Sequence, residues 1–197
     1  MSKITQAFEN ATEIKSVKVK ALSWSLQIML GSLFLALMAQ IAIPLPFSPV
    51  PVTLQTLGVA LLAITLGSQK APWAVVCYLT EASLGWPVLA GGVVSPSWMI
   101  GTTAGYLIGF MISAYLVAKL LESQKNAGFL KNLLCVAVGD VVTIGIGSLW
   151  LAYYVGFEKA FLMGALPFLP GAVMKTIVAT TSIRPVAWAK NKLSNMV

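Results

Sequence analysis

Residues 100–121 read IGTTAGYLIGFMISAYLVAKLL and carry one charged side chain, that of Lys119. An α-helix needs about 20 predominantly apolar residues to cross the hydrocarbon core of a bilayer. The same character extends over the whole chain, because 58% of its 197 residues are hydrophobic and only 10% are charged. Soluble domains average roughly 25% charged residues. The composition therefore predicts an all-α membrane protein.

Comparable apolar spans flank this stretch on both sides. Prolines at four positions between residues 44 and 51 prevent a continuous helix after the first span, and residues 67–70 form a turn. The length then allows six crossings and no separate soluble domain. We expect residues 1–197 to form a single transmembrane domain with a short N-terminal arm at residues 1–20. The six predicted spans are residues 22–44, 53–68, 72–88, 100–121, 131–155 and 169–189.

The distribution of Lys and Arg predicts the orientation, because these residues resist translocation and collect on the cytoplasmic side. With the N-terminus inside, the outer loops carry only Lys159, so both termini are predicted to be cytoplasmic and the arm with them. The Pro- and Gly-rich connections at residues 44–52, 85–99 and 155–170 then lie outside, where we expect the ligand site. The inner cationic residues are Lys3, Lys15, Lys18, Lys20, Lys70, Lys119, Lys125, Lys131, Arg184, Lys190 and Lys192.

Several function classes are disfavoured. The Lys and Arg residues stand in ones and twos between spans, which argues against nucleic-acid binding. Histidine is absent, and Cys77 and Cys135 both lie inside spans, so neither a metal site nor a cofactor is expected. The sequence lacks the G-x-x-x-x-G-K-[ST] loop that cradles phosphates, so the chain is not expected to hydrolyse ATP. Any energy source must therefore be an ion gradient or a partner protein.

A four-residue repeat of small side chains runs along the predicted helix at residues 100–121. Gly101, Gly105, Gly109 and Ser113 leave one face of that helix bare, so that a neighbouring helix or a ligand can approach closely. Helix packing is the favoured interpretation. Tyr106 lies beside this repeat and is either an interfacial anchor or a ligand contact.

Three ionisable side chains fall inside predicted spans. Lys175 shares a helical face with Gly171 and Ala179, which predicts that it faces the bundle, where an ammonium can receive a substrate carboxylate. In the alternative, Lys175 extends to the outer headgroups. Asp140 either accepts hydrogen bonds from a polar ligand or pairs with another helix. Glu81 is expected to face the interior.

An amide and two indoles are the other candidate ligand contacts. Gln55 opens the second span at its outer end, and Trp86 and Trp98 bracket the irregular connection at residues 85–99. These side chains offer a small heterocycle hydrogen bonds and apolar ring surfaces. The two tryptophans fit equally well in the aromatic belt at the membrane surface.

Residues 43–57, IPLPFSPVPVTLQTL, resemble the signature of the BioY family, the biotin-specific S components of energy-coupling factor (ECF) transporters. The resemblance covers residues 22–190. It is supported by GWPVLAGG at residues 85–92, by the Gly-rich residues 101–110, and by LPFLPG at residues 166–171 followed by Lys175.

This resemblance implies an S-component fold with six transmembrane helices and both termini inside, in the bacterial cytoplasmic membrane and in contact with its lipid. It implies high-affinity binding of biotin near the outer face. It also implies delivery of biotin inward with a transmembrane coupling protein and two cytosolic ATPase subunits. Biotin is then the transported ligand, and the chain is not an enzyme. The alternative function is an autonomous secondary transporter or channel for a small organic acid.

The resemblance also assigns roles to residues. In the family a Pro-Gly-Asp-x-x-Lys pattern opens the last helix; Lys175 matches its lysine, but Ala172 stands where the aspartate is usual. Lys175 is predicted to bind the carboxylate of biotin, and Gln55, Tyr106 or Asp140 the ureido ring. The full set of predicted substrate-binding residues is Gln55, Trp86, Gly91, Gly92, Trp98, Tyr106, Asp140 and Lys175.

S components dock their partner through an Ala-x-x-x-Ala pattern on the first helix. The nearest match in this chain is Ser32-x-x-x-Ala36, with Ala39 adjacent. Small residues allow close helix approach. Ser32, Ala36 and Ala39 are therefore predicted to dock the coupling protein.

Overall fold

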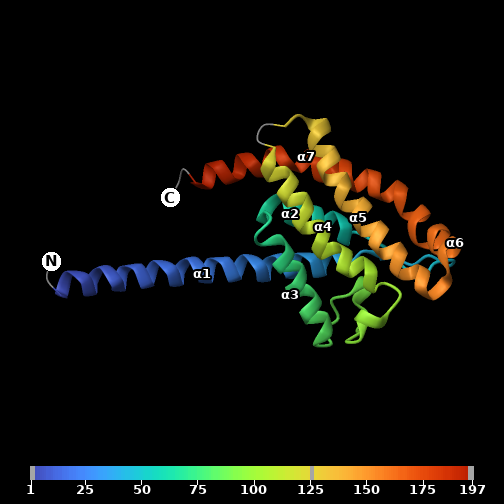
Figure 1. The fold of residues 1–197 in the computed structure, drawn as a ribbon, viewed down its shortest axis with the longest axis horizontal. Helices are drawn as coiled ribbons and strands as arrows, with labels where there is room; N and C mark the ends of the chain where they lie inside the picture. Colours follow the sequence, from blue (N-terminus) through green and yellow to red (C-terminus); the bar gives the residue numbers. More distant parts are fainter. Residues whose placement is uncertain (1–2, 125–126, 195–197) are drawn as a thin grey trace.

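The computed structural model describes residues 3–124 and 127–194, without the side chains of residues 3–20, 190, 191, 193 and 194. Figure 1 shows that helices make up most of this part of the chain, so the prediction of an all-α protein is confirmed. The long helices are α1 (Lys3–Gln40), α4 (Ala104–Ser123), α5 (Phe129–Val155) and α7 (Leu169–Ser194). The shorter ones are α2 (Gln55–Leu66), α3 (Ala71–Ser83), α6 (Phe157–Ala160), η1 (Ala90–Gly92), η2 (Trp98–Ile100), η3 (Phe161–Ala165) and η4 (Leu166–Phe168).

The first predicted span, residues 22–44, is too long at its C-terminal end. Helix α1 ends at Gln40, and β1 (Ala42–Ile43) pairs with β2 (Val52–Thr53) in an antiparallel hairpin. Prolines cannot donate a helical hydrogen bond, so the chain after Gln40 turns back as a hairpin instead of extending the helix. At its other end α1 begins at Lys3, so residues 3–20 of the predicted arm continue the same helix, while residues 1 and 2 lie outside the described residues.

Four stretches of the described chain are long and apolar enough to cross a membrane. They are Ala21–Gln40, Ala104–Ser123, Phe129–Val155 and Phe157–Ala189. Helices α2 and α3 have 12 and 13 residues, which at 1.5 Å per residue gives roughly 20 Å, less than the ~30 Å of a hydrocarbon core. Large apolar side chains such as Leu33, Val141 and Met174 are exposed on the outer faces of α1, α5 and α7. The chain is therefore an integral membrane protein.

The repeat of small residues on α4 packs against α5, which confirms the favoured interpretation. A Cβ added to Gly105 would overlap the Cβ of Trp150, and one added to Gly109 would lie 3.0 Å from the Cα of Thr143. Ser113, a turn further along, borders Gly139 of α5 in the same way. The backbones of α4 and α5 therefore meet where side chains are absent. Gly101 precedes α4, and a Cβ added to it would meet the carbonyl of Trp98 and not α5.

The two ends of the bundle differ in structure. The N-terminal end of α1 and the C-terminal end of α7 lie toward the same side of the molecule, and the β1–β2 hairpin and α6 lie at the opposite end (Figure 1). At the hairpin end, the Ser48 hydroxyl donates a hydrogen bond of 2.8 Å to the carbonyl of Met163 in η3. This bond joins the first connection to the third, residues 155–170, which was predicted to be irregular but is occupied by the short helices α6, η3 and η4.

Candidate ligand-binding site

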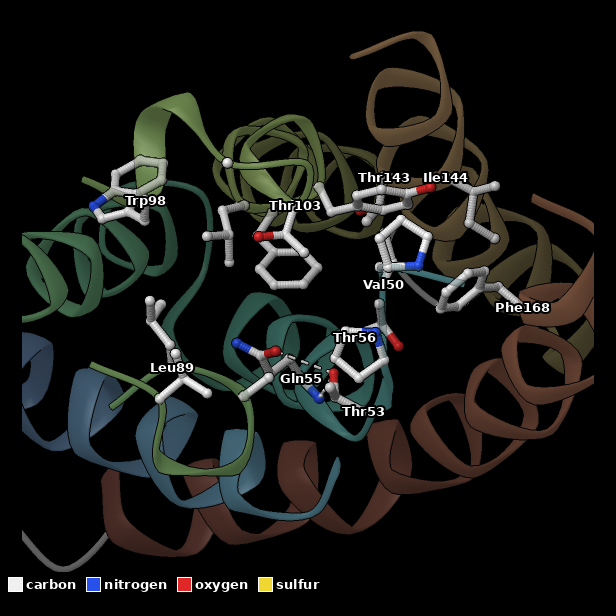
Figure 2. Close-up of a pocket in the computed structure, with 18 of the residues that line it drawn as sticks. Val50, Thr53, Gln55, Thr56, Leu89, Trp98, Thr103, Thr143, Ile144 and Phe168 are labelled. Carbon is white, nitrogen blue, oxygen red and sulfur yellow. Dashed lines mark hydrogen bonds between the residues drawn. The ribbon is translucent and has the colours of Figure 1, made fainter. Parts of the chain in front are cut away.

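A cavity of about 280 Å³ lies where the irregular connections meet the helices (Figure 2). Its volume is close to the lower end of the roughly 300–1,000 Å³ typical of small-molecule sites. Val50 comes from the first irregular connection, Leu89 and Trp98 from the second and Phe168 from the third, and all four line the cavity. In Figure 2, Leu89 and Trp98 lie on one side of it and Ile144 and Phe168 on the other. The three connections that were expected to surround a ligand thus share one cavity.

The N-terminal end of α2 supplies the amide predicted at Gln55. Its Nε2 donates a hydrogen bond of 2.7 Å to the hydroxyl of Tyr78 on α3, and its Oε1 accepts one of 3.1 Å from the hydroxyl of Thr53. Tyr78 is fully buried. These two bonds fix the plane of the Gln55 amide, which lines the cavity and retains one N–H for a ligand.

Lys175 extends from α7 into the cavity toward α2. Its ammonium donates hydrogen bonds of 2.7 Å to the carbonyl of Thr53 and 3.0 Å to the hydroxyl of Thr56. The side chain is therefore bound inside the bundle, and the alternative of extension to the headgroups is wrong. Both acceptors are neutral, so the positive charge itself is uncompensated by a direct ion pair among the described residues. An ammonium has three N–H donors, which leaves one for a ligand.

Tyr106 is a cavity residue and not a membrane anchor, because only 6% of it is exposed. Its hydroxyl donates a hydrogen bond of 2.7 Å to the carbonyl of Gly164, and its ring occupies the space that a side chain at Gly147 would fill. The ring of Phe168 lies 5.9 Å from it between centroids. Tyr106 therefore joins α4, α5 and η3 at the cavity wall.

Asp140 lies on α5 and also lines the cavity. Its Oδ2 accepts a hydrogen bond from the hydroxyl of Thr176 on α7. The two alternatives for Asp140, a helix pair or a ligand contact, thus both find support, since one oxygen joins two helices while the residue faces the cavity. Glu81 points into the bundle as predicted but lies away from the cavity, where it accepts a hydrogen bond from Ser32.

Three of the predicted substrate-binding residues do not line the cavity. Trp86 is 55% exposed, which fits the alternative of the aromatic belt. Gly91 and Gly92 have left-handed backbone conformations, with φ of 67° and 76°, and shape η1 behind Leu89 and Ala90. The predicted residues that do share the cavity are Gln55, Trp98, Tyr106, Asp140 and Lys175.

Other residues that line the cavity were not predicted from the sequence. Thr53 and Thr56 stand inside the stretch quoted above, at residues 43–57, on either side of Gln55. Thr143 follows Asp140 by three residues, which places both on one helical face. Phe110 on α4 had no signal to distinguish it, because an aromatic residue in an apolar span is ordinary.

The predicted docking face on α1 is covered by the chain itself. Ser32 and Ala39 are fully buried and Ala36 is 7% exposed. Small residues do allow close approach here, but the helix that approaches is α3, where Glu81 accepts the hydrogen bond from Ser32. The prediction that these three residues meet a partner is therefore wrong for this conformation.

An apolar cavity with one ammonium, one carboxylate and a few neutral polar groups, enclosed by membrane-spanning helices, defines a membrane protein that binds a small organic molecule. The chain belongs to the BioY family, whose model matches residues 10–192.

Several proteins of related sequence are named as biotin transporters. The chain is 33% identical over 172 residues to biotin transporter BioY of Rhizobium etli, covering 81% of this chain and 91% of that protein. It is 33% identical over 158 residues to biotin transporter BioY2 of Lactococcus lactis subsp. cremoris, covering 78% and 84%. It is 34% identical over 156 residues to a probable biotin transporter BioY of Pyrococcus horikoshii, covering 78% and 91%.

A solved structure has the same fold. It is the S-component for biotin from an ECF-type ABC transporter, which matches with a TM-score of 0.75 and 25% identity, over 87% of this chain and 93% of that one. The relatives are named as transporters, in line with the expectation that the chain is not an enzyme.

Proposed function

We propose that this chain is the biotin-binding membrane subunit of an ECF-type transporter. The observation that carries the proposal is the cavity, in which Lys175 and a few fixed polar groups stand among apolar walls. Biotin has a carboxylate, a polar ureido ring and an apolar body, and each part has a counterpart in the cavity. Membership of the BioY family and the likeness to an S-component for biotin support the same conclusion.

Within this proposal, each pole of biotin has its own residues. Lys175 binds the valerate carboxylate with the N–H that Thr53 and Thr56 leave unused. Gln55 and Tyr106 contact the more polar parts of the ligand, and Trp98 and Phe168 enclose its apolar body from opposite sides. An ammonium in a water-poor cavity binds a carboxylate more strongly than it would in water.

The proposal extends to topology and assembly. In this proposal the chain crosses a bacterial plasma membrane six times, with α2 and α3 completing the four longer spans. Six crossings leave both termini on the same side, and the distribution of Lys and Arg favours the cytoplasm for that side, with the cavity near the outer face. A transmembrane coupling protein and two cytosolic ATPases supply the energy, because the sequence has no phosphate-binding loop of its own.

Ligand retained through purification tests the identity of the cargo. Protein purified from cells grown with biotin should release biotin on denaturation, detected by mass spectrometry in near-stoichiometric amount. Protein purified in the same way from biotin-starved cells is the control and should release little. A different small acid at high occupancy would contradict the proposal.

Reconstitution tests the need for partners. Liposomes that contain this chain alone should bind biotin without accumulating it, and accumulation should require the coupling protein, the ATPases and ATP. Accumulation by the chain alone, driven by an ion gradient, would support the autonomous transporter instead.

A further inference from the structure

A groove on the surface of the bundle lies toward the end opposite the ligand cavity. Helix α2 begins at Gln55 in the wall of the cavity and leads to the turn of Ser68 and Gln69, which lines the groove. The groove has a volume of about 640 Å³ and is otherwise lined by side chains of α1, α3 and α4. Figure 1 shows that α2 and α3 meet at the end of the bundle from which the N-terminal part of α1 projects. No residue lines both the groove and the cavity, so the proposed function leaves the groove without a role.

The polar lining of the groove consists mostly of hydrogen-bond donors that have no partner. Trp24, Trp73, Tyr115 and Lys119 all line it, and none of their side-chain polar groups has a hydrogen bond or ion pair to the described part of the chain. The indole of Trp150, by contrast, donates to a backbone carbonyl of the same chain. Indole and ammonium groups only donate hydrogen bonds. The groove therefore fits a ligand that accepts them.

The charges around the groove favour an anion. The carboxylate of Glu122 on α4 accepts hydrogen bonds of 2.7 and 2.6 Å from the backbone N–H and the hydroxyl of Ser68, so both of its oxygens are directed at the turn. Glu122 itself does not line the groove. Lys70, which follows the turn, donates a hydrogen bond of 2.7 Å to Gln27 on α1. The ammonium groups of Lys70 and Lys119 therefore outweigh the single charge of Glu122.

The polarity of the groove changes along the helix axis. Met111, Tyr115 and Lys119 are spaced by four residues on α4 and thus share one face. At 1.5 Å per residue they cover about 12 Å, from within the span to near its end at Ser123. Val76 on α3 is a further apolar side chain of the lining. The lining runs from apolar through amphipathic to cationic, the order of the acyl chain, glycerol and phosphate of a phospholipid.

We propose that this groove binds an anionic phospholipid. Lys119 pairs with the phosphate, because a charged donor and a charged acceptor form the stronger kind of hydrogen bond. The indoles and the hydroxyl of Tyr115 donate to the remaining headgroup oxygens, and Val76 and Met111 contact the acyl chain. Basic pockets between transmembrane helices recognise anionic headgroups in this way. In the proposed topology the lipid belongs to the inner leaflet, and the site adds a second ligand to a protein whose cargo binds elsewhere.

Lipid selectivity of the wild-type chain tests the proposal without any substitution. Native mass spectrometry of the purified chain in neutral detergent, with short-chain phosphatidylglycerol added, should show one lipid that binds first and saturates. Short-chain phosphatidylcholine, which has no net charge, should bind at least about fivefold more weakly. Equal affinity would mean that the groove holds ordinary bilayer lipid, and would overturn the proposal.

The free headgroup separates a lipid site from a site for a soluble phosphate. Glycerol phosphate has the anionic group but no acyl chain, so it lacks the contact with the apolar half of the groove. It should bind at least about tenfold more weakly than short-chain phosphatidylglycerol. Binding of equal strength would assign the groove to a soluble anion and overturn the proposal.

Removal of the cation locates the site. Lys119→Met should weaken the binding of phosphatidylglycerol by about fivefold and leave that of phosphatidylcholine unchanged. The matched control is Lys131→Met, which removes an exposed cation near the start of α5 outside the groove and should bind phosphatidylglycerol like the wild type. The proposal is overturned if Lys119→Met binds this lipid as tightly as the wild type, or if both variants lose affinity equally. Because the comparison of lipids uses the wild-type chain, it decides the matter even if Lys119→Met folds poorly.

Discussion

The ammonium of Lys175 shows how a single charge can serve a ligand without disrupting a membrane bundle. Transfer of an unpaired Lys to the centre of a bilayer costs about 2.5–3.5 kcal/mol on insertion scales. Here the carbonyl of Thr53 and the hydroxyl of Thr56 accept two of its hydrogen bonds, at 2.7 and 3.0 Å. The partners stabilise the ammonium but are neutral, so its affinity for an anion is preserved.

Lys175→Met should therefore weaken biotin binding by about 10- to 150-fold, the equivalent of a hydrogen bond to a charged group of about 1.5–3 kcal/mol. Biotin amide, which has no negative charge, should lose much less. Isothermal titration of both ligands measures the difference. Lys119→Met removes an exposed cation on α4 outside the cavity and serves as the control. Equal losses for biotin and its amide would exclude the carboxylate role.

Among single residues, the sequence predicted correctly those cavity residues whose polar or charged side chains are unusual in an apolar span. A lysine, an aspartate and a glutamine near apolar spans stand out, and Lys175, Asp140 and Gln55 all line the cavity. Trp86 and Trp98 each had two equally good interpretations from the sequence. The fold distinguishes them, because Trp86 is exposed whereas Trp98 is buried and its indole N–H donates a hydrogen bond of 2.9 Å to the hydroxyl of Ser83. Spacing alone does not reveal which tryptophan a loop turns inward.

Helices α4 and α5 form the most extensive contact between elements of the described chain, and glycines on both helices allow it. A Cβ at Gly105 would lie 2.9 Å from the carbonyl oxygen of Ile146 as well as overlapping Trp150. Neither neighbour is a flexible side-chain tip, so the helices would have to separate. Trp150, whose indole N–H donates to the carbonyl of Gly101 at 3.0 Å, would move with them.

Gly105→Ala should lower stability by about 1–3 kcal/mol through overpacking, and should weaken biotin binding because Tyr106 is its neighbour. Thermal unfolding in detergent, followed by circular dichroism, measures the first effect. Gly145→Ala is the matched control: Gly145 lies on α5 with nothing within 4 Å of an added Cβ. That variant should be neutral, or more stable by about 0.5–1 kcal/mol. A Gly105→Ala protein as stable as Gly145→Ala would contradict the packing.

The small-residue repeat predicted that this face of α4 packs closely against a helix, because its period matches a helix face, but it did not identify α5 as the partner. The β1–β2 hairpin was not predicted, since two-residue strands have no detectable alternation and the prolines indicate only where a helix cannot continue. The docking face on α1 was assigned wrongly for a related reason. Small residues indicate that some helix comes close, and the pattern does not identify α3 as that helix.

The two ends of the molecule differ, because one holds the free ends of α1 and α7 and the other holds the connections around the cavity. The C-terminal end of α7 and the N-terminal end of α1 lie on one side, and the irregular connections meet around the cavity toward the other. These connections carry a single cationic side chain, that of Lys159, which favours an outer location for them. Composition thus predicted the helical membrane architecture, and the distribution of charge predicts an orientation that labelling can test. The cavity could not be predicted, because it forms only when three connections far apart in sequence come together.

Thiol labelling of intact cells tests the orientation. In a Cys77→Ser/Cys135→Ser background, Val94→Cys in the exposed second connection should react with a membrane-impermeant maleimide. Gln69→Cys, in the turn between α2 and α3, should react only after the cells are permeabilised. The reverse pattern would place the cavity on the cytoplasmic side and contradict the proposed topology.

Isothermal titration of biotin into the purified wild-type chain, freed of retained ligand, is the most direct test of the central claim. In the proposed binding mode, the groups that meet the two poles of biotin are already held by hydrogen bonds within the protein, so little ordering is needed on binding. We expect one site per chain and a dissociation constant in the nanomolar range, about −12 kcal/mol at 1 nM. A dissociation constant in the millimolar range, about −4 kcal/mol, would contradict the assignment of this cavity to biotin.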